Sequence, residues 1–191
     1  MSQKPADNAP VKPANKRGCC APAAVQALYQ MELSGANVTE IVAEYENSRL
    51  GQEIDGEHYL DADHGWFRSV VSGVVSQQRT IDPEIHSVLT PEWPLSRLHT
   101  LLRSILRAAV YELINRKEVP ARVVISEYVD VAKAFFSDDE PGMINGVLDR
   151  ITRKLRVEEL AERAVDSRRR RRNGTRWETR LTTMPGPANL I

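Results

Sequence analysis

Apolar residues recur three and four positions apart along most of the chain between residues 16 and 157. The clearest stretch covers 97–114, where apolar side chains follow at alternating steps of three and one for about five helical turns. This spacing predicts an α-helix with one wide apolar face. Ser96 is a suitable N-cap, and Asn115 a suitable residue just past the end. The face contains Leu98, Leu101, Leu102, Ile105, Leu106, Ala109, Val110, Leu113 and Ile114.

A second helix is predicted with Pro120 as its first residue, because proline is well tolerated at the first position of a helix. The residues expected to be buried along it are Val124, Tyr128, Val131 and Phe135. Asp138 or Asp139 can cap the following helix, whose acidic start suits the positive end of the helix dipole.

That following helix contains an unusual pair, Asn145-Gly146, in the stretch "DDEPGMINGVLDRI". Asn-Gly is typical of hairpin turns, yet the apolar residues around it keep helical spacing. Because glycine inside a helix costs about 1 kcal/mol relative to alanine, its presence needs a reason. We predict that Gly146 lets another helix pack closely and that Asn145 makes a half-buried hydrogen bond. The alternative is direct contact of the pair with an RNA or protein partner.

Weaker helical patterns precede residue 97. Three helices are predicted in 23–33, 38–50 and 65–78, with Asn37 or Thr39 as the cap of the second, and a short one in 81–89. No segment alternates long enough to predict a strand. The fold class is therefore all-α, with about seven helices.

The composition of the chain indicates its cellular compartment but not its partner. Lys+Arg and Asp+Glu both number 26, so the formal net charge is zero and the global charge favours no partner. Cys19 and Cys20 are adjacent and cannot staple a fold, which indicates free thiols in a reducing compartment. No apolar run is long enough to span a bilayer, and the polar N-terminus has no signal-peptide pattern. We expect a cytoplasmic protein.

Sequence motifs for catalysis or metal binding are missing. The chain has no glycine-rich phosphate loop and no zinc-protease motif. The histidines, His58, His64, His86 and His99, are scattered, and the acidic residues of 55–63 lack the spacing of a calcium loop. We therefore predict no catalytic residues, no metal site and no cofactor, and expect a protein that is not an enzyme.

Basic residues gather in three places. Lys16-Arg17 precede the first predicted helix, Arg97, Arg103 and Arg107 share one face of the helix at 97–114, and Arg168 begins a run of five arginines. Together they favour a partner with a phosphate backbone. By composition, 1–15 is expected to be a disordered arm, 16–157 the helical domain, and 158–191 a basic, disordered tail.

Four segments, taken together and in order, resemble the NusB family of transcription antitermination factors. They are "NKRG…AAVQALYQMEL" (15–33), "LLRSILRAAVYEL" (101–113), "VPARVVISEYVDVAKAF" (119–135) and "INGVLDRI" (144–151). The resemblance covers about 16–157 and implies two packed three-helix bundles. It also implies binding to the boxA element of ribosomal RNA together with the ribosomal small-subunit protein NusE, within the RNA polymerase antitermination complex.

The resemblance further implies two sets of site residues. The RNA-binding set is Lys16, Arg17, Gln26, Tyr29, Arg103 and Arg107. The set facing the partner protein is Phe135, Asp139 and Met143. Tyr29, Phe135 and Met143 also fit positions in the core.

Two other functions remain open at this point. The same helical domain serves as an RNA-binding accessory module in an rRNA cytosine methyltransferase type, and a helical domain can also bind proteins without any RNA. A homodimer is compatible with either.

Overall fold

The structure, a computed structural model, describes residues 20–48, 53–54, 57–58, 64–91 and 93–161. Its helices are α1 (Cys20–Ser34), α2 (Val38–Ser48), α3 (His64–His86), the 3-10 helix η1 (Leu95–Arg97), α4 (Thr100–Asn115), α5 (Ala121–Phe135) and α6 (Glu140–Leu155). Two short antiparallel strands, β1 (Glu53–Ile54) and β2 (Glu57–His58), lie between α2 and α3. The all-α class is confirmed.

The two ends of the chain lie largely outside the described residues. The predicted arm 1–15 and most of the predicted tail cannot be compared with the structure, which describes neither 1–19 nor 162–191. Residues 157–161 are helical, so the tail was predicted to begin a few residues too early. None of the described helices is long and apolar enough to cross a membrane.

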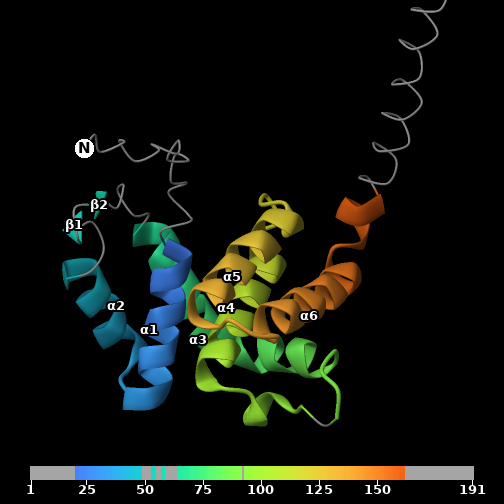
Figure 1. The fold of residues 1–191 in the computed structure, drawn as a ribbon. Helices are drawn as coiled ribbons and strands as arrows, with labels where there is room; N and C mark the ends of the chain where they lie inside the picture. The colour runs from blue at the N-terminus through green and yellow to red at the C-terminus, as the bar shows by residue number, and fades with distance from the viewer. Residues whose placement is uncertain (1–19, 49–52, 55–56, 59–63, 92, 162–191) are drawn as a thin grey trace, which may run out of the picture.

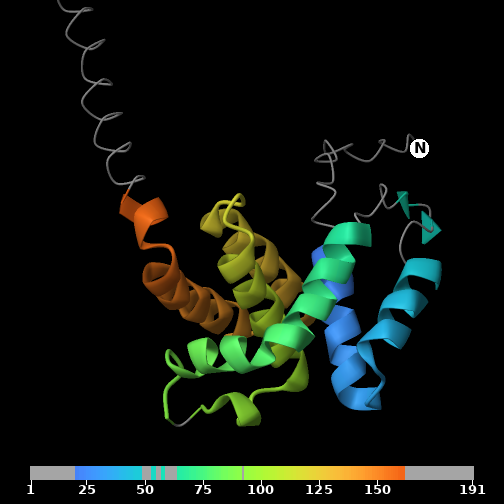
Figure 2. The same ribbon diagram turned by 180° about the vertical axis from the view of Figure 1, so that it is seen from behind.

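The helices form two three-helix bundles (Figures 1 and 2). In the first, α1, α2 and α3 contact one another, and in the second, α4, α5 and α6 do so. The bundles join because α4 also packs against α1 and α3. The prediction of two packed three-helix bundles is therefore confirmed.

Helix α4 is the shared element of the two bundles, and it is buried almost all round. A helix with partners on all sides has apolar or small residues on every face rather than on one stripe. Its buried residues are Leu102, Ser104, Ile105, Leu106, Ala108, Ala109, Val110, Tyr111, Glu112 and Leu113. Glu112 is the carboxylate among these buried residues. It accepts a hydrogen bond of 2.8 Å from the hydroxyl of Tyr128 in α5.

Helix α3 differs from its prediction. The sequence predicted two helices in 65–78 and 81–89, but α3 runs without interruption from His64 to His86 and contains Pro83. Proline has no N–H to donate to the carbonyl of Arg79, and its ring pushes against that carbonyl. The bend of α3 seen in Figure 2 is consistent with this effect.

The helix caps confirm one prediction and correct another. Asn37 and Glu40 bond to each other's backbone N–H groups in a capping box at the start of α2, with N–O distances of 3.0 and 3.4 Å. Ser96 does not cap α4. The cap is His99, whose Nδ1 accepts a hydrogen bond from the N–H of Leu101 at 3.2 Å.

The close-packing prediction for the Asn-Gly pair is wrong. Asn145 and Gly146 are both exposed, and a Cβ added at Gly146 would meet no atom within 4 Å. The close helix contact lies instead at Gly73 of α3, where an added Cβ would overlap the ring of Tyr111 in α4. The Tyr111 hydroxyl lies 3.2 Å from the hydroxyl of Ser69, which fixes the ring above this glycine.

The end of α4 is held by a side chain from another helix. Arg156, buried just after α6, donates to the carbonyls of Leu113 (2.7 Å), Arg116 (2.9 Å) and Val119 (3.2 Å). The last carbonyls of a helix have no partner within the helix and carry its negative dipole end. A guanidinium offers five N–H donors and a positive charge, so Arg156 satisfies both needs at once.

The two glycines give a matched test of helix packing. We expect Gly73→Ala to lower the free energy of unfolding by about 1–3 kcal/mol, because the added methyl overlaps Tyr111. Gly146→Ala should instead raise it by up to about 1 kcal/mol through helix propensity. Urea unfolding followed by circular dichroism measures both, and an equal effect of the two substitutions would contradict the packing difference.

The role of Arg156 has a control one turn earlier. Arg156→Met should cost about 2–4 kcal/mol of unfolding free energy, because it leaves several buried carbonyls without donors. Arg153→Met removes an exposed ion pair with Asp149 and should cost about 0.5 kcal/mol or less. Similar midpoints for the two variants in a thermal melt would rule out the capping role.

Candidate functional site

A cluster of two arginines and two carboxylates joins the two bundles. Arg107 of α4 forms a bidentate pair with Asp82 of α3, with Nε–Oδ1 and Nη2–Oδ2 distances of 2.8 and 3.0 Å. Its third donor, Nη1, lies 3.1 Å from Oε2 of Glu32 near the end of α1. Arg103, one turn earlier on α4, donates from Nε (3.0 Å) and Nη2 to Oε1 of the same Glu32. We call these four residues the arginine cluster.

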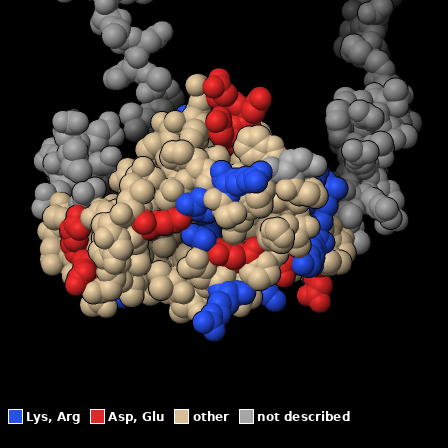
Figure 3. All heavy atoms as spheres, turned by 90° about the horizontal axis from the view of Figure 1, so that it is seen from below, with Lys and Arg blue, Asp and Glu red and all other residues tan. Residues whose placement is uncertain are grey.

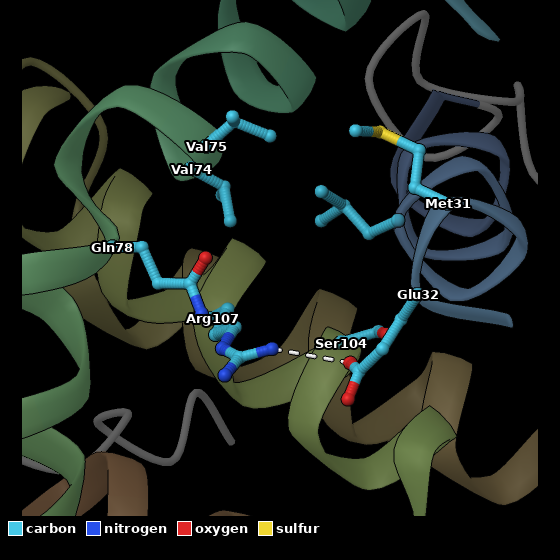
Figure 4. Close-up of a pocket in the computed structure, with 8 residues that line it drawn as sticks. Met31, Glu32, Val74, Val75, Gln78, Ser104 and Arg107 are labelled. Carbon is cyan, nitrogen blue, oxygen red and sulfur yellow. Dashed lines mark hydrogen bonds and ion pairs between the residues drawn. The ribbon is translucent and has the colours of Figure 1, made fainter. Parts of the chain in front are cut away.

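Two hollows open beside the arginine cluster. One, of about 280 Å³, has apolar walls from α1 and α3, with Met31, Val74 and Val75 facing its interior above Arg107 and Glu32 (Figure 4). The other, of about 660 Å³, is bounded by both arginines, both carboxylates, His86 and the segment 94–96. Both arginines therefore lie at the border between protein interior and open space.

The cluster pairs two positive with two negative side chains, so its formal charge sums to zero. Burial opposes the charge of Arg107, but the hydrogen bonds and negative charges of Asp82 and Glu32 outweigh it, and the pKa of Arg107 is raised above its ordinary value. The side chains of Arg103 and Arg107 are each 15% exposed. Viewed from below, acidic and basic side chains are interleaved on this face rather than gathered into one basic field (Figure 3).

The structure brings together only some of the predicted RNA-binding residues. Arg103 and Arg107 are adjacent, whereas Arg97 lies apart from α4, in η1. On α1, Gln26 is exposed and Tyr29 half-buried, so Tyr29 is not a fully buried core residue. Lys16 and Arg17 lie outside the described residues.

The sequence analysis missed Glu32 and Asp82. Glu32 is 71 residues before Arg103, and Asp82 is 25 residues before Arg107. No local motif links residues at such separations, and both acids sit in stretches that show only helical spacing. Only the packing of α1 and α3 against α4 brings them to the arginines.

The residues predicted to face a partner protein fall into two hollows. Asp139 and Met143 line an open groove of about 610 Å³ between α6, the start of α4 and the segment after α3. Trp93, 61% exposed, and Gly146 line the same groove. The remaining lining residues are Val88, Leu89, Thr90, Leu98, His99, Leu102, Asp138, Glu140, Val147 and Arg150. We call this the α6 groove.

Phe135 lies apart from the α6 groove. It was expected to be buried in its helix, but it is 44% exposed at the last residue of α5. It lines a smaller hollow of about 360 Å³ together with Ala21, Pro22 and Val131. Because α5 ends there, its last turn has no following helix to cover this side chain.

The described residues contain no group of three or more His, Cys, Asp or Glu side chains arranged to hold a metal ion. Cys20 is buried and not in a disulfide. The described surface instead has two features suited to binding: a hollow lined by paired arginines and an apolar groove, both on an all-helical double bundle.

The double three-helix bundle places the chain among all-helical binding proteins. Comparison of its sequence with known families then identifies the family. The chain belongs to the NusB family, whose sequence profile matches residues 22–153. This is a family of transcription antitermination factors.

Curated relatives agree with the family assignment. The chain is 58% identical over 158 residues to the transcription antitermination protein NusB of Sinorhizobium fredii, covering 83% of this chain and 98% of that protein. It is 60% identical over 149 residues to the protein of the same name from Rhizobium etli, covering 78% and 93%.

Solved structures show the same fold. T. maritima NusB superposes with a TM-score of 0.63 at 28% identity, covering 76% of this chain and 96% of that one. A crystal structure of antitermination factors NusB and NusE in complex with dsRNA gives a TM-score of 0.60 at 25% identity, covering 73% and 97%.

Proposed function

We propose that this protein is a cytoplasmic antitermination factor that binds the boxA element of ribosomal RNA together with NusE. In this role it promotes processive transcription of ribosomal operons as part of the RNA polymerase antitermination complex. The observation that carries the proposal is the identity of 58% to an antitermination protein over nearly its whole length. The solved relative in complex with NusE and RNA supports the choice of partners.

The RNA side of the proposal rests on the arginine cluster and the exposed face of α1. Single-stranded RNA is held by cations along its backbone and by flat side chains that stack on its bases. Arg103 and Arg107 supply the cations, Tyr29 supplies a flat ring and Gln26 an exposed amide. Lys16 and Arg17, which precede α1 in the sequence, are proposed to add two more positive charges to this interaction.

The α6 groove is the proposed docking surface for NusE. Protein interfaces are centred on exposed aromatic and aliphatic side chains with charged groups at the rim. In the α6 groove, Trp93 and Met143 are the proposed apolar centre, and Asp139 and Arg150 are the charged groups. It also gives a reason for the glycine inside α6, because any side chain at position 146 would project into open space that the partner is proposed to fill.

The function is tested by titrating boxA RNA with the full chain, with and without NusE. We expect NusE to tighten binding, and a scrambled RNA of equal length to bind at least about tenfold more weakly, because backbone contacts alone carry no sequence information. Equal affinity for both RNAs in the presence of NusE would overturn the proposal and leave only charge attraction.

The groove is tested with two leucines on the same helix. Gly146→Leu adds a side chain at the groove, where a Cβ meets no atom within 4 Å, and should lower NusE affinity at least about tenfold while the protein stays folded. Gly142→Leu is the control, because Gly142 is exposed on α6, has equal room for a side chain and does not line the groove. Calorimetric titration with NusE measures both, and unchanged binding by Gly146→Leu would place the partner elsewhere.

A further inference from the structure

We propose that Glu32 sets the RNA affinity of this protein by occupying the arginine donors that an RNA phosphate group would otherwise use. The inference rests on the proposed function and concerns the same arginine cluster. A carboxylate and a phosphate diester group each carry one negative charge and accept hydrogen bonds from guanidinium in similar geometry. Glu32 is in this sense an internal competitor of the RNA backbone.

The donors of Arg103 are fully used. Its Nε and Nη2 donate to Glu32, Nη2 also donates to Thr100 Oγ1 at 3.0 Å, and Nη1 donates to the carbonyls of Leu98 and Ser96. These bonds account for all five N–H groups of a guanidinium. The backbone carbonyls hold the arginine in place, so a phosphate reaches its charge only by replacing Glu32.

Of the two carboxylates, Glu32 is the one that can leave. Asp82 holds Arg107 with two parallel hydrogen bonds, a geometry that is both strong and specific. Glu32 accepts one bond from Arg107 on Oε2 and two from Arg103 that share Oε1, so neither arginine holds it with two parallel bonds. It also sits in the last turn of α1, where the helix dipole disfavours a negative charge.

The surroundings of Glu32 allow the exchange. Its carboxylate lies between the two hollows beside the arginine cluster, and its side chain is 30% exposed. Figure 4 shows it beside the smaller hollow, reaching from α1 toward Arg107 of α4. A phosphate entering from the larger hollow meets both arginines, and the displaced carboxylate can turn into water without crossing the core.

This arrangement has a definite consequence for binding. RNA that replaces Glu32 exchanges one ion pair for another. The two arginines therefore contribute less to the RNA affinity than their charges alone would. Removing the carboxylate should therefore tighten RNA binding through these two arginines in particular. Each further phosphate contact on a single strand should also make the slope of log affinity against log salt steeper by about 0.7.

The test compares Glu32→Gln with a charge-matched control. Glu46→Gln removes one negative charge from the same bundle and releases Arg68, which pairs with Glu46 at 2.6 Å. We expect Glu32→Gln to bind boxA RNA, in the presence of NusE, about three- to tenfold more tightly with a steeper salt slope. Glu46→Gln should stay within about twofold of the parent chain, because its arginine lies outside the cluster.

A chain without the two arginines shows whether the gain in RNA affinity comes through them. In a chain carrying Arg103→Gln and Arg107→Gln, Glu32→Gln should no longer increase affinity, and thermal melts check that each variant is folded. Three outcomes would overturn the inference. They are an equal gain in affinity from both Glu→Gln changes, weaker RNA binding by Glu32→Gln, and a gain that persists without the arginines. Failure of the parent chain to distinguish boxA from scrambled RNA would instead remove the proposed function itself.

Discussion

The burial of α4 between two bundles is the constraint on which the rest of this structure depends. A helix with protein on every side cannot leave its polar groups to water, so each needs a fixed partner from a neighbouring helix. Tyr128 bonds Glu112 in the last turn of α4, and Arg156 satisfies the carbonyls at its end. At its exposed edge, Glu32 and Asp82 pair with the two arginines. The polar contacts of α4 thus join α1, α3, α5 and the end of α6 into one unit.

The same helix connects the two proposed binding surfaces. Leu102 lines the α6 groove, while its neighbour Arg103 belongs to the arginine cluster. The segment just before α4 is shared in the same way, with Leu98 and His99 in the groove and Leu95 and Ser96 at the larger hollow. Because one short stretch of backbone contributes to both surfaces, a partner that orders it on one side also fixes the geometry on the other. This shared backbone is a physical route by which the two proposed surfaces can be coupled.

The arginine cluster also shows why a basic motif does not define a binding surface by its sequence. Arg103 and Arg107 are well placed for a phosphate backbone, yet both are already engaged by carboxylates from other helices. The net charge of the cluster is close to zero, in keeping with the interleaved charges of Figure 3. Its capacity to bind an anion depends on which carboxylate can be exchanged, and that follows from bond geometry and exposure.

Local patterns in the sequence determined the helices, because hydrophobic spacing and capping residues act over a few positions. The all-α class, the capping box of Asn37 and most of the buried face of α4 followed from them, and the quoted motifs were enough to predict the family. Tertiary structure decided the rest: the single bent α3, the exposure of Phe135 and Gly146, the close contact at Gly73, the buried cap by Arg156 and the pairing of Glu32 with two arginines. These features depend on which helix faces lie against each other across separations of up to 75 residues. The free energy of such contacts comes from packing and desolvation between distant segments, which no short stretch of sequence contains.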